Sequence, residues 1–300
     1  MNLKNKTMIK KMFLGVLALG LMLTSCSDDD DNASNLETLT LNLNGLEALG
    51  SNFVYEGWII VDGQPVTTGR FTSVNFPQNF PVDATQLSNA TAFVLSIEPL
   101  VDPDPAPAPT KVLRGEFTGN SASVNTDLIG DLTNVSGTFF LRTPTDEMMP
   151  GAGNNGNDEY GVWFGTPGMP PTANLTLPDV SQNAGWTYEG WVIGDSGPIS
   201  TGTFDNFGGR DNFTGFSGTE FNQGPPVPGE DFFLNAPTGE VFPLDVRNRM
   251  VVISLEPVPD DSPAPFAIKP LVGVAGTETA PSTHDFSANV ASLPTGTVTR

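Results

Sequence analysis

The 300-residue sequence has very few of the side chains that hold metals, form disulfides or attract anions. It contains one cysteine and one histidine, which excludes a disulfide framework, a Cys/His zinc site and a paired-histidine metal centre. Lys and Arg number 13 against 34 Asp and Glu, giving a formal net charge of −21. Nucleic acids would repel such a chain at long range. We therefore expect no nucleic-acid partner, no metal and no cofactor.

Long helices are also disfavoured, because 32 Gly and 27 Pro place a helix breaker at about one position in five. Hydrophobic residues make up 38% of the chain and include 20 Phe, enough for sizeable cores. A length of 300 residues corresponds to about two domains. Short strands separated by Gly and Pro turns are typical of β-sandwiches. Together with the repeated strand pattern described below, these features predict an all-β chain of two tandem β-sandwich domains.

The N-terminus has the pattern of a secretory signal peptide. Four lysines lie within residues 4–11, and the next twelve residues, 12–23, are apolar or glycine. At about 1.5 Å per residue, such a helix is too short to cross a hydrocarbon core of roughly 30 Å. We therefore expect residues 1–25 to be removed during export rather than to stay as a membrane span.

The sequence Leu-Thr-Ser-Cys at residues 23–26 resembles the bacterial lipobox. The resemblance implies cleavage before Cys26 and acylation of this residue, so that the chain is bound to a membrane by acyl chains. An unmodified, buried Cys26 is the alternative. Residues 26–35 follow as an acidic tether, and four consecutive aspartates at 28–31 cannot pack into a core.

The tether also indicates the membrane to which the protein is sorted. Ser27 followed by the aspartates resembles the signal that sends some lipoproteins to the outer face of the outer membrane. A simple spacer is the alternative interpretation. We expect a lipid-anchored protein of the cell envelope, in the outer membrane and exposed at the surface.

An internal repeat organises the remaining chain. Residues 55–71 align without a gap with residues 188–204, and ten of the 17 positions are identical, including the motif Tyr-Glu-Gly-Trp. Residues 93–99 match residues 251–257, and both segments end in Glu-Pro. The offset grows from 133 to 158, so the second copy carries 25 additional residues, which we place near 207–248 as an ordered surface loop.

The repeated segments predict strands. Asp62-Gly63 lies between two β-forming runs and predicts a hairpin over residues 55–71. Residues 93–99 and 111–117 predict two further strands, and residues 137–142 and 160–164 predict a hairpin that opens the second copy. These assignments divide the chain into a first repeat, 36–135, and a second, 136–300, although the hairpin could instead pair with the first sheet.

The repeated pattern resembles the extracytoplasmic C-terminal domain of anti-sigma-K-type factors. It consists of an aromatic residue, a strand Trp, a Gly-x-Phe and a strand ending in Glu-Pro before an Ala-Pro segment, at 55–115 and 188–273. The resemblance implies a β-sandwich with the Trp strand in its core. Such factors also have a cytoplasmic sigma-binding domain and a transmembrane helix, which this sequence lacks. We therefore expect no direct contact with a sigma factor.

No residue pattern indicates catalysis, and we predict no catalytic residues. His284 has no nucleophile motif with it, and the Gly-rich stretches lack a phosphate-binding signature. Glu98 and Glu256 could form a carboxylate pair, but a role at the strand end explains them better. Four aspartates at positions 102, 104, 260 and 261 could bind calcium, but their spacing fits solvated turns better than a known calcium loop.

Glu56 and Glu189 are the candidates for ligand binding, because each lies on the same strand face as a Trp in its repeat. Pairing of each glutamate with a basic residue of a neighbouring strand explains them better than a ligand contact does, and we expect such a partner. The sequence as a whole predicts a non-catalytic binding or structural module of the envelope, with an envelope protein or glycan as its partner. An extracytoplasmic sensor subunit is the second hypothesis, and an envelope hydrolase is the third.

Overall fold

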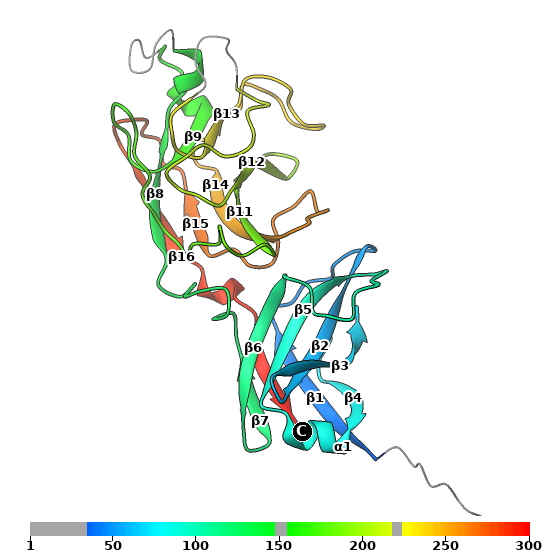
Figure 1. The fold of residues 1–300 in the computed structure, drawn as a ribbon. Coiled ribbons are helices and arrows are strands. Elements are labelled where there is room, and N and C mark those ends of the chain that lie inside the picture. The colour runs from blue at the N-terminus through cyan, green and yellow to red at the C-terminus, as the bar shows by residue number, and fades with distance from the viewer. Residues whose placement is uncertain (1–34, 148–154, 218–223) are drawn as a thin grey trace, which may run out of the picture. The chain divides into compact units, whose positions relative to one another are not determined.

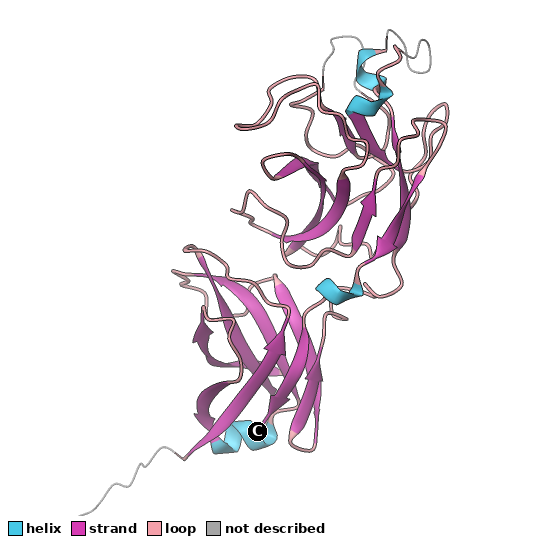
Figure 2. Cartoon of the chain, turned by 180° about the vertical axis from the view of Figure 1, so that it is seen from behind, coloured by secondary structure: helices cyan, strands magenta, loops and turns pink. Residues whose placement is uncertain are grey.

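The computed structural model of the protein describes residues 35–147, 155–217 and 224–300. The expected signal peptide, Cys26 and nearly all of the tether lie outside these residues. Strands dominate the described part of the chain, and its few helices are short (Figure 2). No helix within these ranges has the length and apolar character that a membrane crossing requires.

The first body is an eight-stranded sheet in the order β3-β2-β5-β6-β7-β17-β1-β4 (Figure 1). Its strands are β1 (Leu36–Asn44), β2 (Phe53–Val61), β3 (Gln64–Phe71), β4 (Gln78–Asp83), β5 (Ala92–Pro99), β6 (Lys111–Thr118), β7 (Ser121–Val124) and β17 (Thr295–Thr299). One short helix, α1 (Ala84–Asn89), is capped by Asp83, whose carboxylate accepts the backbone N–H of Gln86. Every strand pairing in this sheet is antiparallel.

The second body is a nine-stranded sheet in the order β12-β11-β14-β15-β16-β8-β9-β13, with β10 paired to β8. Its strands are β8 (Ser136–Leu141), β9 (Gly161–Phe164), β10 (Leu175–Thr176), β11 (Trp186–Ile193), β12 (Pro198–Phe204), β13 (Gly229–Asp231), β14 (Met250–Pro257), β15 (Leu271–Val274) and β16 (His284–Ala288). Three single-turn 3-10 helices, η1 (Pro144–Asp146), η2 (Asp158–Tyr160) and η3 (Val290–Ser292), lie in the connections. The expectation of an all-β chain with two sandwich-like bodies is confirmed.

The predicted hairpin is present in both bodies. Strand β2 pairs with β3, and β11 pairs with β12, each with a register shift directly after the Gly of the Tyr-Glu-Gly-Trp motif. Asp62 and Gly63 both have positive φ, which is the conformation that the tight turn of a two-residue hairpin requires. The predicted pairing of β8 with β9 is also present, and it belongs to the second sheet.

The motif glycine is required by close packing. A Cβ atom at Gly57 would lie 2.5 Å from Oγ1 of Thr68, and one at Gly190 would lie 2.4 Å from Oγ1 of Thr201. Thr68 and Thr201 occupy equivalent positions of the two repeats, so both bodies use the same contact. A larger residue would have to displace the threonine side chain, and a phenylalanine ring (Phe93 or Phe164) also lies against the glycine in each body.

The C-terminal strand corrects the predicted domain boundary. We assigned residues 136–300 to the second repeat, but β17 lies between β7 and β1 in the first sheet (red beside blue in Figure 1). In the second sheet the same place, between β16 and β9, is taken by β8. In the first sheet this place is filled by the end of the chain. The local residue pattern could not reveal this, because strand pairing between distant segments leaves no local signal.

The insertion is also more than a surface loop. Residues 229–231 form β13, which pairs with β9 at the edge of the second sheet. Phe232, Leu244 and Val246 are buried in the core. The additional residues therefore contribute to the folded body, within the described part of 207–248.

We predict that deleting residues 295–300 destabilises the first body selectively. The deletion leaves the backbone groups of β1 and β7 that face β17 without partners, and it removes the fully buried side chain of Val298. In hydrogen exchange followed by mass spectrometry, amides of β1 should exchange faster in the shortened chain. Strands β8 and β9 serve as the internal control, and equal protection of β1 in both chains would refute the assignment.

Candidate functional site

Both bodies contain the same buried hydrogen-bond chain from Trp to Ser to Glu. Trp58 Nε1 donates to Ser96 Oγ over 2.8 Å, and Trp191 Nε1 donates to Ser254 Oγ over 2.7 Å. Each serine hydroxyl in turn donates to a glutamate two residues later on the same strand, Glu98 in the first body and Glu256 in the second. The repeated Trp and Ser are therefore needed to place a buried carboxylate.

These buried glutamates hold the Pro-rich turn that follows each strand. The carboxylate of Glu98 accepts the backbone N–H of Ala108 over 2.8 Å, and that of Glu256 accepts the N–H of Phe266 over 2.9 Å. Both glutamates are almost completely buried. Their position agrees with the strand-end role that we inferred, and it explains why Glu-Pro recurs in the two repeats.

Glu56 has the basic partner that we considered for it. Its Oε1 accepts the hydroxyl of Thr67 over 2.5 Å, and its Oε2 lies 3.3 Å from Nε of Arg70 on β3. The Arg70 guanidinium also donates to the carbonyls of Pro99 and Leu100. The positively charged side chain of Arg70 thus links the Trp strand to the end of the strand that carries Glu98.

Glu189 occupies the equivalent place in the second body but has no such partner. Its Oε1 accepts the hydroxyl of Ser200, as Glu56 accepts Thr67. The residue opposite it on β12 is Thr203, where the first body has Arg70 opposite Glu56. Within the described ranges Glu189 forms no ion pair, so the expectation of a basic partner is wrong for this residue.

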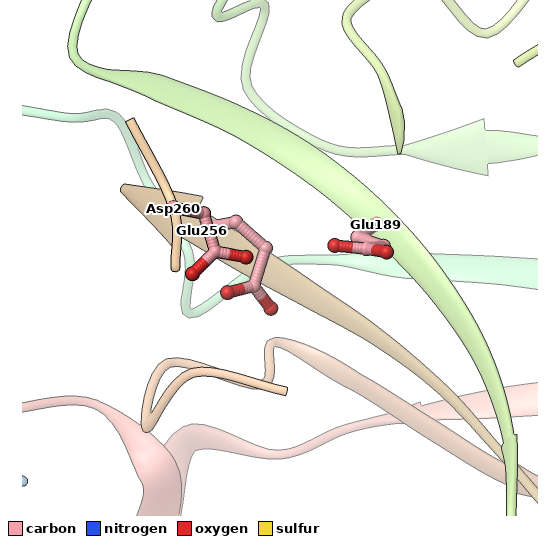
Figure 3. A group of neighbouring side chains, drawn as sticks. All are labelled: Glu189, Glu256 and Asp260. Atoms are coloured by element: carbon pink, nitrogen blue, oxygen red, sulfur yellow. The ribbon is translucent and has the colours of Figure 1, made fainter. Parts of the chain in front are cut away.

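Three carboxylates meet where the arginine is missing. One oxygen from each of Glu189, Glu256 and Asp260 lies within 4.8 Å of the others (Figure 3). Glu189 and Glu256 are buried, and Asp260 is exposed. Burial raises the pKa of Glu189, and burial raises that of Glu256 to about 8. This carboxylate cluster is a candidate cation site, and oxygen donors of this kind suit calcium.

The other candidate residues have structural partners. The carboxylates of Asp102 and Asp104 each accept a backbone N–H two residues later, which stabilises the turn as the sequence suggested. His284 accepts the N–H of Gly276 at Nδ1, and its Nε2 lies 2.9 Å from the carbonyl oxygen of Glu278. Asp261 is exposed, and its carboxylate accepts a hydrogen bond from the side-chain amide of Asn52 over 2.6 Å. Cys26 lies outside the described residues.

A second group of buried acids lies in the insertion, where no residue pattern indicates it. Burial raises the pKa of Asp211 and of Asp231 to about 7, and that of Glu230 to about 8. Asp231 is fully buried and accepts hydrogen bonds from Trp163 Nε1 and from Thr145. Oε2 of Glu230 is buried and has no hydrogen-bond partner among the residues that the structure describes. No periodicity marks these residues, because they lie in a Gly- and Pro-rich segment that reads as loop.

We predict that Ser254→Ala destabilises the protein by about 1–3 kcal/mol, because it leaves the buried Trp191 N–H without an acceptor and takes a donor from Glu256. Denaturant unfolding in EDTA measures the loss. Ser282→Ala, at an exposed position, is the matched control and should change the free energy of unfolding little. Equal effects of the two substitutions would contradict the buried hydrogen-bond chain.

We predict that Glu230→Gln stabilises the protein progressively as the pH rises from about 5 to about 8. The native state holds the proton of Glu230 up to a pKa of about 8, whereas the unfolded chain releases it near its ordinary pKa of 4.5. The wild type therefore loses stability across this interval, by up to roughly 1.4 kcal/mol per pH unit, and the amide removes that loss.

Thermal unfolding at several pH values measures this effect as the difference in melting temperature between variant and wild type. Glu278→Gln, at an exposed glutamate, is the control and should show no such trend. A difference between Glu230→Gln and wild type that stays constant from pH 5 to pH 8 would show that Glu230 ionises freely in the fold.

The comparisons with known proteins found no match, and the two bodies of this chain are therefore compared with each other. No family model, no curated protein and no solved structure matches the chain. The internal comparison is informative, because the two bodies share the hairpin bulge, the Trp–Ser–Glu chain and the glutamate of the Tyr-Glu-Gly-Trp motif. They differ in the charge opposite that glutamate, which is where the candidate site lies.

Proposed function

We propose that this chain is an exported lipoprotein whose two β bodies act as a non-catalytic binding or structural module of the cell envelope. The observation that carries the proposal is the position of Cys26. It is the only cysteine of the chain, and it follows an apolar segment and the residues Leu-Thr-Ser. Acyl chains on Cys26 would bind the protein to a membrane, since each buried methylene contributes about 0.8 kcal/mol.

The hydrogen bonding of the repeated polar residues supports a module that does not catalyse a reaction. Glu98 and Glu256 hold turns, Glu56 forms an ion pair, and both nitrogens of His284 contact backbone groups. General acid–base catalysis needs a group within reach of a substrate proton. In the described part of the chain, these side chains are instead used to hold strands and turns together.

The repeated motif also supports a second role, that of a sensor subunit. Its resemblance to the outer domain of anti-sigma-K-type factors favours a module that receives an envelope signal and passes it to a membrane partner. Crosslinking in intact cells followed by co-purification distinguishes the two roles. An inner-membrane regulator as the main partner would favour sensing, whereas an outer-membrane protein or glycan would favour the binding or structural role at the surface.

We predict that Cys26→Ser abolishes acylation. In a Gram-negative host given labelled palmitate, the wild type should carry the label and the variant should not. The variant should also leave the membrane fraction, because its anchor is lost. Labelling of the variant, or an unlabelled wild type, would refute the lipoprotein assignment.

We further predict that the wild type is degraded when intact cells are treated with a protease, as the surface location requires. A periplasmic protein of the same cells serves as the control and should survive the treatment. Survival of this chain in the same cells would place its two bodies on the inner side of the outer membrane.

A further inference from the structure

We propose that a pocket in the second body binds an uncharged peptide segment of a partner protein, through one aromatic side chain and a neighbouring carbonyl oxygen. The pocket has a volume of about 330 Å³ and lies beside Arg142, the residue that follows β8. Such a segment would be what the proposed binding module recognises, so the proposal rests on that function. The acylation of Cys26 plays no part in it.

The pocket is formed by segments that are not repeated in the chain. Arg142 follows β8, Met169 lies in the connection after β9, and residues 224–226 come from the insertion. All of the described residues that line the pocket lie outside 188–204 and 251–257, the segments that match the first repeat. The matched segments carry the hydrogen-bond chains that hold strands and turns together, whereas the unmatched segments build this hollow.

The wall of the pocket is mostly apolar. Met169 lines it together with five proline rings, at positions 144, 170, 171, 225 and 226. Apolar walls with few polar groups, around a volume of about 300 Å³ or more, are typical of ligand pockets. The C–H edges of proline rings can pack against the negative face of an aromatic ring. The wall therefore suits an aromatic side chain.

Arg142 supplies the polar contact. Its Nε and Nη2 donate to the two carboxylate oxygens of Glu147 over 2.8 and 2.9 Å. The side chain of Glu147 is only 1% exposed, so this paired contact fixes the guanidinium. Nη1 forms no hydrogen bond with the described residues, and the Arg142 side chain keeps 17% of its surface exposed. Nη1 can therefore donate to an oxygen atom of a ligand in the pocket.

The charges around Arg142 favour an uncharged oxygen as the acceptor. Glu147 already neutralises the guanidinium, and the buried Asp158 lines a second hollow on which Arg142 also borders. A ligand carboxylate would add another negative charge to this ion pair, at a high cost in desolvation. A peptide carbonyl oxygen accepts the hydrogen bond without that cost.

The same wall disfavours a glycan. A sugar has hydroxyl groups on most of its edges, and each loses its hydrogen bonds with water when it is buried. Among the described residues that line the pocket, Arg142 and Glu147 are the only ones with polar side chains. A buried sugar would leave most of its hydroxyls without side-chain partners there. Of the two partner classes, protein and glycan, the pocket fits the protein.

The test follows the four tryptophan indole N–H signals of the ¹⁵N-labelled full chain by NMR. Trp163 is the reporter, because its Nε1 donates to the carbonyl oxygen of Arg142 over 3.1 Å and a Cβ atom on Gly224 would lie 2.7 Å from its ring. The probe is acetyl-Ala-Phe-Ala-amide at up to about 10 mM, which reveals dissociation constants in the millimolar range. The Trp163 signal should move progressively, and those of Trp58 and Trp191 should stay in place.

Two variants at the pocket should weaken the binding of this probe several-fold. Met169→Ser removes an apolar part of the wall at a position that is 78% exposed, where the fold tolerates the change. Val101→Ser, at a valine of the first body that is 87% exposed, is the matched control and should bind as the wild type does. Arg142→Lys keeps a positive charge beside Glu147 but loses the guanidinium fork that places Nη1.

Two further probes test the class of ligand. N-acetylphenylalanine, which ends in a carboxylate, should bind more weakly than the tripeptide amide. A disaccharide of N-acetylglucosamine should leave the Trp163 signal in place, and a larger shift with it than with the tripeptide would overturn the proposal in favour of a glycan.

The proposal is also overturned if the tripeptide leaves the Trp163 signal in place or moves all four indole signals alike. Binding to Met169→Ser as tight as to the wild type would contradict it as well. If the tripeptide fails to bind while the wild type carries the palmitate label on Cys26, the pocket proposal is wrong and the envelope role stands.

Discussion

Several carboxylates of this protein are buried, and the groups that satisfy them hold its strands and turns together. A carboxylate removed from water must receive hydrogen bonds, a counter-charge or a proton. In both bodies the glutamate at the strand end accepts hydrogen bonds from a serine hydroxyl and from a backbone N–H. These bonds hold the Trp strand, its neighbour and the Pro-rich turn together. The glutamate of the Tyr-Glu-Gly-Trp motif pairs with Arg70 in the first body and lies opposite Thr203 in the second. The candidate site lies at this second glutamate.

The internal repeat explains how such a difference can arise. Because the hydrogen-bond framework is present twice, one body can keep the arginine that neutralises Glu56 while the other exchanges it for Thr203. The hairpin and its bulge are retained in both. A change of one residue therefore alters the charge of a buried site and leaves the strands that build it in place.

The local elements of the fold could be predicted from the sequence. The Asp62-Gly63 turn, the two matched hairpins and the β8–β9 pair follow from turn chemistry and alternation, which are properties of neighbouring residues. The place of β17 and the strand in the insertion were missed. Antiparallel pairing between residues 40 and 299 depends on the path of the whole chain, and nothing near either residue reports it.

The candidate site was predicted only in part, again because its residues are far apart in the sequence. Glu189 was singled out because it lies beside a repeated Trp, and Asp260 was assigned to a solvated turn. The fold brings these two acids and Glu256 together, across 71 positions of sequence between Glu189 and Asp260. The aligned repeats already show Thr203 where the first repeat has Arg70. Only the structure shows that β12 places Thr203 opposite Glu189.

The buried hydrogen-bond chain is tested by a double-mutant cycle on Ser254→Ala and Glu256→Gln, with denaturant unfolding as the measurement. Ser254 and Glu256 belong to one chain from Trp191 to the turn at Phe266, so the two losses in the free energy of unfolding should not be additive. Additive losses, or two single variants as stable as the wild type, would contradict the account.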